Sequence, residues 1–559
     1  MSYPTLVEVF ERSAAQYAEK IALRLPKPVV AGEDGQAAST CSYEEISFRE
    51  LKRLSDECAE ALHRLGIRPG DKVALLSRPR IEWAVSMLGL LKLGAITVPI
   101  DPHLVPAEVQ RILHEMDACM AISDHAHLKH VRGVLHLRQI ITMDRADDSR
   151  LLALSDLLRE RRDPPMNAIK PSDLAFILCT SGTTGCAKGV MLAHENLTSN
   201  LTGVFERLSV TSQDVVLSIA PWNHIFGLIV LWAALWKGAK LIYTDDYKNL
   251  AQLMVENQIT ILTAVPKLYH AMFAKVETEI SKRFLGRLLY RRLPKLVGWR
   301  LKKKLSKKLR FFLSGSAPLD PAVEQGFRKL GIGLIEGYGM TETSPVLTFS
   351  TPFNEKYGSV GPPLPNIEMK IEDPNEEGIG EVLVRGPNVM RGYYKNEKLT
   401  RKTIDPDGWL HTGDLGFLDE DGWLHLKGRK KNVIVLDTGK NVYPEEVEWE
   451  LGRSPLIEDI LVKGAAASQS RTGYKGVEII QAFVYPNWEN VSARLPQIRL
   501  EDLRAPMRAQ IKQLIWEEIK SRSHNLAPYK RIRSEQDVII VEKPFEKTST
   551  LDIKRYLYQ

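Results

Sequence analysis

Residues 179–190 read Cys-Thr-Ser-Gly-Thr-Thr-Gly-Cys-Ala-Lys-Gly-Val and follow the apolar run 174–178. This run has the length of a buried strand, so we expect the chain to leave a sheet through a loop rich in glycine and hydroxyl groups. Glycines let backbone N–H groups form a concave row, and the lysine adds a positive charge. The expected donors are Thr180, Ser181, Gly182, Thr183, Thr184, Gly185 and Lys188. The stretch predicts a polyphosphate site, with a solvated turn as the alternative.

The loop is not a Walker A loop, because Ala187 and Gly189 stand where that pattern needs glycine and then Ser or Thr. It resembles the signature loop of the adenylate-forming (AMP-binding) superfamily, although that family usually has proline in place of Ala187. The resemblance runs from about Glu8 to Tyr556 and is closest to the long-chain fatty acyl-CoA synthetases. It implies that ATP, Mg²⁺ and CoA are the cofactors.

The domain organisation is expected to be α/β. Alternating strand and helix patterns up to about residue 350 predict layered α/β subdomains, and short strands with turns predict a β-rich subdomain over about 350–427. The resemblance implies a large N-terminal domain over 1–428 and a small, mobile α+β domain over 429–559, with a hinge near Lys431.

Composition is that of an ordinary soluble globular protein, with 44% hydrophobic and 26% charged residues. The longest apolar run, 226–236, is too short to span a bilayer, and the N-terminal residues do not resemble a secretory signal. Five scattered cysteines without CxxC spacing disfavour a disulfide framework and a zinc site. We expect a cytoplasmic location, with peripheral contact at the inner membrane surface as an open alternative.

Pro221–Gly227 ends a predicted strand and contains His224. A lone histidine near apolar residues is usually a satisfied core residue, but the resemblance implies that His224 lies beside the carboxylate being activated. Amino-acid-activating relatives need an aspartate here for the substrate ammonium. Trp222-Asn223-His224 contains none, which argues against an amino-acid substrate.

Two further motifs are expected to bind the nucleotide. The first follows a predicted strand and has small side chains that let a planar ligand approach the backbone: Gly315, Ser316 and Ala317. The second contains Gly337, Tyr338, Gly339, Met340, Thr341 and Glu342. The resemblance implies that adenine stacks on Tyr338, that Thr341 contacts phosphate and that Glu342 binds Mg²⁺, which typically takes one or two carboxylates plus phosphate oxygens.

Downstream motifs complete the expected site. The resemblance implies that Asp414 and Arg429 bind ribose, that Lys431 is the pivot and that Gly439 admits the pantetheine arm of CoA. By itself, the aspartate in Gly-Asp-Leu-Gly would be a turn former.

The C-terminal motif departs from the family. Asp552 stands where the family has a lysine that bridges carboxylate and α-phosphate. Three explanations compete: Lys554 or Lys547 supplies the charge, the enzyme works without it, or the protein is a non-catalytic nucleotide- or acyl-binding regulator. We favour Lys554, which is two residues away and points to the same side of an extended segment.

Lys282–Arg310 carries thirteen Lys and Arg and no acidic residue, whereas elsewhere acidic residues outnumber basic ones, 69 to 63. Leucine and aromatic residues alternate with these charges, as in a helix on an anionic membrane surface. A solvated basic face is the alternative, and nucleic acid lacks a supporting motif.

The sequence thus predicts an ATP-dependent acyl-CoA synthetase that activates a medium- or long-chain fatty acid through an acyl-AMP. A ligase for aromatic or short acids, or one that loads a carrier protein, remains open. The sequence leaves the oligomeric state open as well.

Overall fold

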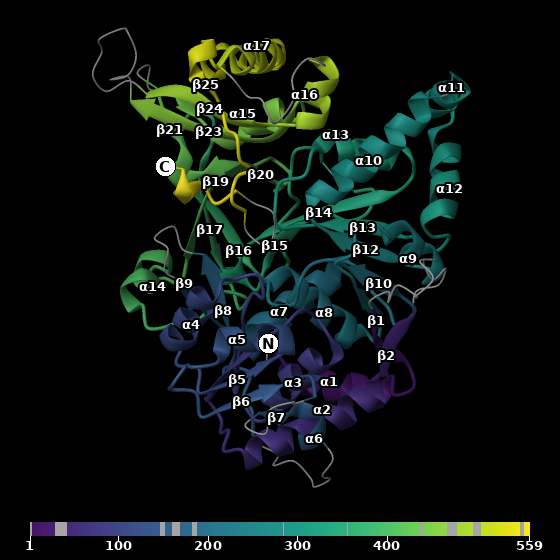
Figure 1. The fold of residues 1–559 in the computed structure, drawn as a ribbon, viewed down its shortest axis with the longest axis vertical. Coiled ribbons are helices and arrows are strands. Elements are labelled where there is room, and N and C mark those ends of the chain that lie inside the picture. Colours follow the sequence, from purple (N-terminus) through teal and green to yellow (C-terminus); the bar gives the residue numbers. More distant parts are fainter. Residues whose placement is uncertain are drawn as a thin grey trace. The chain divides into compact units, whose positions relative to one another are not determined.

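A computed structural model describes residues 3–27, 42–145, 151–158, 168–181, 187–282, 284–354, 356–436, 440–466, 478–495, 505–547 and 553–558. The chain divides into two units, whose elements are labelled in Figure 1. The larger unit contains residues 1–369, 384–410 and 422–424, and the smaller unit contains residues 370–383, 411–421 and 425–559. Part of the segment expected to be a β-rich subdomain therefore groups with the C-terminal residues. The hinge at Lys431 stays a prediction.

The first sheet of the larger unit has eight strands, and its interior pairs are parallel. The two edge strands pair antiparallel with their neighbours. In order across the sheet the strands are β15 (Val346–Phe349), β14 (Gly333–Gly339), β13 (Phe311–Ser314), β12 (Ile261–Ala264), β10 (Val215–Ser218), β11 (Lys240–Tyr243), β1 (Ile21–Pro26) and β2 (Tyr43–Ser47).

The second sheet also has eight strands, of which β8 to β7 are parallel, while β9 and β18 add antiparallel pairs at one edge. In order the strands are β18 (Gly392–Tyr393), β9 (Ala187–Ala193), β8 (Leu174–Ser181), β4 (Ile96–Pro99), β3 (Lys72–Leu76), β5 (Met120–Ser123), β6 (Gln139–Thr142) and β7 (Leu152–Ala153). The expected α/β layers are confirmed.

Each sheet contributes one face to a shared main core. The side chains of a strand alternate between the two faces of its sheet, so the other face packs elsewhere. In β3, for example, Val73 and Leu75 belong to this core, while Ala74 and Leu76 belong to a second cluster on the opposite face. The main core includes side chains of the helices α1 (Leu6–Gln16), α2 (Phe48–Arg64), α3 (Ile81–Lys92), α7 (His194–Arg207) and α8 (Ile225–Lys237).

Further helices cover the outer faces of the two sheets. On the first sheet they are α9 (Leu250–Glu256), α10 (Pro266–Ser281), α12 (Pro294–Leu305) and α13 (Pro321–Lys329). On the second sheet they are α4 (Pro106–Glu115) and α5 (Leu128–Val131). Helix α11 (Phe284–Arg292) precedes α12, and the short helix α14 (Glu397–Thr403) follows β18.

Helix α8 shows how sequence sets an element that positions the site. Its side chains are apolar on nearly all faces, as expected for a helix buried between two sheets. His224 caps its N-terminus. Gly238 ends it with φ 67°, a conformation that favours glycine.

The smaller unit has its own core, formed by α15 (Pro444–Gly452), α17 (Ala505–Arg522) and a three-stranded sheet of β23 (Ile457–Ala466), β24 (Glu478–Pro486) and β25 (Val538–Ile540). A four-stranded sheet precedes it in the chain, in the order β16 (Glu368–Glu372), β17 (Gly380–Arg385), β19 (Leu410–Leu418) and β20 (Leu424–Arg429).

Among the described helices, none has both the length and the apolar composition that a membrane span requires.

Candidate functional site

Three predicted motifs converge at one edge of the first sheet. The chain segments that contain His224, Gly315 and Tyr338 come from β10, β13 and β14, which run parallel with β12 between β10 and β13. The carboxyl ends of these strands therefore meet at the same edge. Strand order reverses beside β10, and in open α/β sheets ligands bind at such a point.

His224 is a neutral hydrogen-bond donor in this arrangement. Burial lowers the pKa of its imidazole to about 4, although Asp101 opposes the shift. The backbone N–H of Phe226 donates to Nδ1 at 3.3 Å, so the ring proton is on Nε2. An Nε2–H group can donate to a carboxylate oxygen at neutral pH.

The loop after β13 lies against the start of α8. A Cβ atom on Gly315 would be 3.3 Å from the Phe226 ring, which shows how closely the ring packs against this backbone. Ser316 is exposed and has φ 74°, a left-handed conformation that is uncommon for serine and often occurs at functional sites. Ala317 is half-buried.

Glu336 ties this loop to β14 directly before Gly337 and Tyr338. Its Oε1 accepts a hydrogen bond from the backbone N–H of Leu319 at 2.8 Å. Burial raises the pKa of the Glu336 carboxyl to about 8; the Leu319 N–H opposes this and nearby Glu324 adds to it. This carboxyl is therefore mostly protonated at neutral pH.

This raised pKa predicts a loss of stability in alkali. Since the folded protein holds the Glu336 proton more tightly than the unfolded chain, its free energy of unfolding falls as pH rises from about 5 through about 8. Glu336→Gln removes this dependence. In urea unfolding at pH 6 and pH 9, wild type should lose stability relative to the variant by on the order of 1 kcal/mol or more. Equal losses in both proteins would contradict the prediction.

The signature loop joins two antiparallel strands. β8 and β9 pair with Thr180 opposite Lys188, so both residues lie in strands rather than in the loop as expected. Ser181 is the last residue of β8. Gly182, Thr183, Thr184 and Gly185 lie outside the described residues. The hairpin places Lys188 beside β18, which pairs with β9.

Strand β18 supplies a residue that the sequence analysis missed. The hydroxyl of buried Tyr393 donates to Glu342 Oε1 at 2.7 Å, and Lys188 Nζ lies 5.5 Å from the centroid of the Tyr393 ring. Burial and the Glu342 carboxylate raise the pKa of Tyr393, so its hydroxyl stays protonated and remains a donor. Tyr393 thus joins the predicted phosphate ligand to the predicted metal ligand.

Three asparagine side chains hold the backbone around Glu342. Asn388 Nδ2 donates to the Thr343 carbonyl at 2.9 Å, and Asn200 Nδ2 donates to the Val346 carbonyl at 2.7 Å. Asn196, one helical turn before Asn200 on α7, donates to two carbonyls of the segment leading to β18. We call these three residues the asparagine clamp. In the structure α7 buries a run of polar residues where apolar ones are usual, and this burial marks the clamp.

The donor set suits a magnesium ion that arrives with a nucleotide. Glu342 is 9% exposed, and its Oε2 accepts no hydrogen bond from any described residue. The described part of the chain contains no cluster of three His, Cys, Asp or Glu able to hold a metal by itself. A single carboxylate next to phosphate oxygens is a common magnesium environment. Met340 and Thr341 directly precede Glu342 in the turn 340–343.

In the smaller unit, the structure brings Asp414 and Arg429 together. Arg429 Nε lies 2.8 Å from Oδ1 of buried Asp414, whose backbone N–H donates to Thr412 Oγ1 at 3.0 Å. The two residues predicted to bind ribose are therefore neighbours. Lys431 is exposed in the short helix Lys430–Asn432. Gly439 lies outside the described residues.

The two C-terminal lysines, Lys547 and Lys554, differ in how closely they pair with a carboxylate. Lys547 Nζ pairs with Asp459 at 2.5 Å. Lys554 Nζ is 3.9 Å from Glu546, whose side chain is largely exposed. Lys554 is thus more available than Lys547 for another anion. Asp552 lies outside the described residues.

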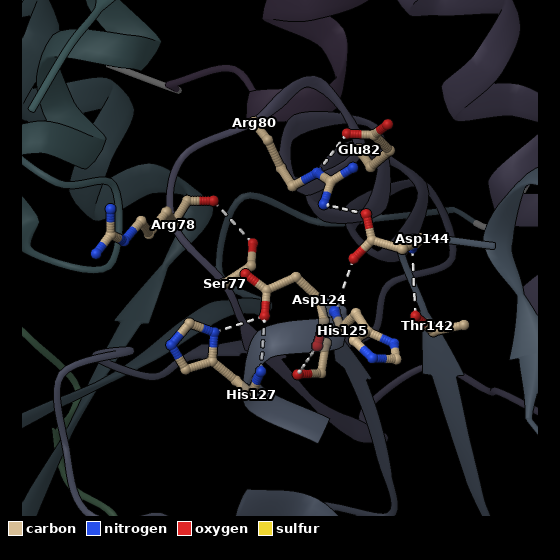
Figure 2. Close-up of polar contacts among 10 residues, drawn as sticks. Ser77, Arg78, Arg80, Glu82, Asp124, His125, His127, Thr142 and Asp144 are labelled. Carbon is tan, nitrogen blue, oxygen red and sulfur yellow. Dashed lines mark hydrogen bonds and ion pairs between the residues drawn. The ribbon is translucent and has the colours of Figure 1, made fainter. Parts of the chain in front are cut away.

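A second polar cluster, which the sequence analysis also missed, lies at the carboxyl ends of β3, β5 and β6 (Figure 2). Arg80 donates to Asp144 at 2.8 Å and to Glu82 at 2.7 Å, and Asp144 also accepts from the His125 N–H at 2.7 Å. Burial opposes ionisation of Asp144, but these two donors together lower its pKa. The cluster connects the loops that follow three neighbouring strands.

Comparison with known proteins agrees with this geometry. The AMP-binding enzyme family matches residues 10–394. Long-chain-fatty-acid–CoA ligase 6 of Mus musculus is 28% identical over 499 residues, 80% of this chain and 71% of the relative. 4-Coumarate–CoA ligase 3 of Oryza sativa subsp. japonica is 32% identical over 451 residues, 77% of this chain and 76% of the relative.

A crystal structure of the anthranilate CoA ligase AuaEII in complex with anthranoyl-AMP is 26% identical to the chain. It superposes with a TM-score of 0.76, covering 100% of this chain and 97% of that one. The chain therefore belongs to the AMP-binding enzyme family, and it is an acid–thiol ligase of the AMP-forming acyl-CoA synthetase class.

Proposed function

We propose that this ligase activates a medium- or long-chain fatty acid with ATP and Mg²⁺ and transfers the acyl group to CoA. In the first step a carboxylate oxygen attacks the α-phosphorus of ATP and pyrophosphate leaves. In the second step the sulfur of CoA attacks the acyl carbonyl, losing its proton, and AMP leaves.

The observation that carries this proposal is the hydrogen bond from Tyr393 to Glu342 with Lys188 over the same ring. It places a cation and a carboxylate on one rigid support, where Lys188 would stabilise charge on the phosphates and Glu342 would hold Mg²⁺. The complex of the 26% identical relative contains an acyl-adenylate, which supports an adenylate intermediate here.

The proposed class of acid substrate follows from the residues at the edge of the first sheet where the parallel strands end. Neutral His224 would donate Nε2–H to the substrate carboxylate. Nothing in 222–224 carries the negative charge that an ammonium group needs. The start of α8 next to this edge is apolar, which suits an uncharged acyl group.

An ATP–pyrophosphate exchange assay over a panel of acids tests the proposal. We expect the fastest exchange with medium- or long-chain aliphatic acids and release of AMP when CoA is added. Fastest exchange with coumarate or anthranilate would instead assign an aryl substrate, as in two of the relatives. AMP release with a carrier protein but not with CoA would change the acceptor. No exchange with any acid would favour a non-catalytic regulator.

We further propose that Lys554 replaces the usual lysine near the C-terminus. Lys554→Ala should lower the exchange rate by at least ~100-fold, because a missing charge at a phosphate costs a few kcal/mol. Lys543→Ala, which removes an exposed lysine of the same unit, is the control and should exchange at the wild-type rate. Normal exchange by Lys554→Ala would refute this role without refuting the ligase activity.

A further inference from the structure

Helices α11 and α12 lie at the periphery of the larger unit (Figure 1), and α12 packs against that unit. Leu305 and Leu309 are buried in the outer core. A Cβ atom on Gly298 would be 1.7 Å from the Leu330 carbonyl oxygen, so α12 packs directly against the end of α13. The inner side of α12 is therefore fixed in place.

The outer side of these helices exposes large apolar residues. Trp299 is 53% exposed and Leu293 is 55% exposed, and Leu288 and Leu296 are similarly open. Leu296, Trp299 and Lys303 follow each other at three- and four-residue spacing on one helix face. Lys303 Nζ lies 3.7 Å from the centroid of the Trp299 ring. Apolar and basic groups thus share one surface.

The charge on this surface is not neutralised locally. Of the basic residues in 282–310, Arg310 pairs with Asp214 and Lys282 pairs with Glu279. No acidic side chain of the described residues lies within ion-pair distance of the remaining ones that the structure describes. These are Arg287, Arg291, Arg292, Lys295, Arg300, Lys302, Lys303, Lys304, Lys307 and Lys308. We call the exposed members, with Leu288, Leu293, Leu296 and Trp299, the basic–apolar face.

We infer that the basic–apolar face docks on the surface of an anionic lipid bilayer. Basic side chains would meet the lipid headgroups, while Trp299 and the leucines would enter the headgroup–acyl boundary, as in interfacial helices. A nucleic acid would match the charge but would leave the aliphatic side chains exposed to water. The inference concerns attachment only and does not depend on the proposed acid substrate.

Sedimentation with lipid vesicles tests this inference on the full chain without substrate. The protein should pellet with phosphatidylglycerol-containing vesicles at low salt and should not pellet with pure phosphatidylcholine vesicles. Salt at about 0.5 M should release it, because such a concentration screens surface charge. The triple variant Lys295→Glu, Arg300→Glu, Lys303→Glu should bind at least ~100-fold more weakly, since each charge near the surface contributes about 1 kcal/mol. Trp299→Ser should also weaken binding, and its loss of affinity should persist at intermediate salt.

The matched control reverses three exposed basic residues on α14: Lys398→Glu, Arg401→Glu and Lys402→Glu. This variant should pellet like wild type. The inference fails if wild type does not pellet with anionic vesicles, if it pellets equally with neutral ones, or if the control loses binding as much as the triple variant. Tighter binding to duplex DNA than to vesicles at the same salt concentration would also overturn it.

Discussion

Glu342→Gln should lower the rate of ATP–pyrophosphate exchange by at least ~100-fold, because glutamine keeps the shape of the side chain but removes the charge that holds Mg²⁺. Tyr393→Phe should have a smaller effect that depends on the metal. It removes the 2.7 Å hydrogen bond to Glu342 and leaves the ring beside Lys188. We expect a loss of about tenfold at limiting Mg²⁺ that is largely recovered at saturating Mg²⁺.

Two measurements separate positioning from general damage. Binding of Mn²⁺ in the presence of ATP, followed by electron paramagnetic resonance, should weaken in both variants without any turnover. The adjacent Tyr394→Phe is the control, since its hydroxyl bonds to Asp117 rather than to Glu342. If Tyr394→Phe shows the same dependence on Mg²⁺ as Tyr393→Phe, Tyr393 has no positioning role.

Gly339→Ala should reduce both stability and exchange severely. A Cβ atom at this position would be 1.9 Å from the Pro345 carbonyl oxygen, which also accepts a hydrogen bond from the Met340 N–H at 3.1 Å. The backbone between Tyr338 and Glu342 must move by about an ångström, a displacement that can cost about a hundredfold in rate. We expect a loss of about 1–3 kcal/mol in the free energy of unfolding.

Gly337→Ala is the matched control for stability. Its nearest contact would be 3.8 Å, an ordinary van der Waals distance, so its urea midpoint should stay at the wild-type value. A comparable loss of stability in both variants would show that the close contact between Gly339 and Pro345 does not cause the loss in Gly339→Ala.

The sequence predicted those features that follow from local pattern. The apolar run 174–178 placed β8 (Leu174–Ser181) to within a few residues. The motifs around Gly315 and Tyr338 were expected close together, and the parallel order of β13 and β14 confirms that these segments leave one edge of the sheet. Periodicity and turn-forming residues are properties of short segments, so they can be recognised in a single sequence.

The missed residues depend on contacts between distant segments. Tyr393 is 51 residues from Glu342, and Asn200 is 146 residues from Val346. No spacing rule connects such positions, because they meet only when distant segments pack together in the fold. The raised pKa of Glu336 is likewise set by burial, which the letters of the motif do not show.

The asparagine clamp has a consequence for how this region tolerates change. Its amide groups bond to main-chain oxygens, which every amino acid provides, so these bonds place no demand on the side chains at Pro387, Val389 or Val346. The residues that supply the acceptor carbonyls can therefore be substituted more freely than the three asparagines that donate to them. Asn200→Asp would replace the amide N–H donor with a carboxylate oxygen, which can only accept. This oxygen would face the Val346 carbonyl oxygen, and the two would repel each other.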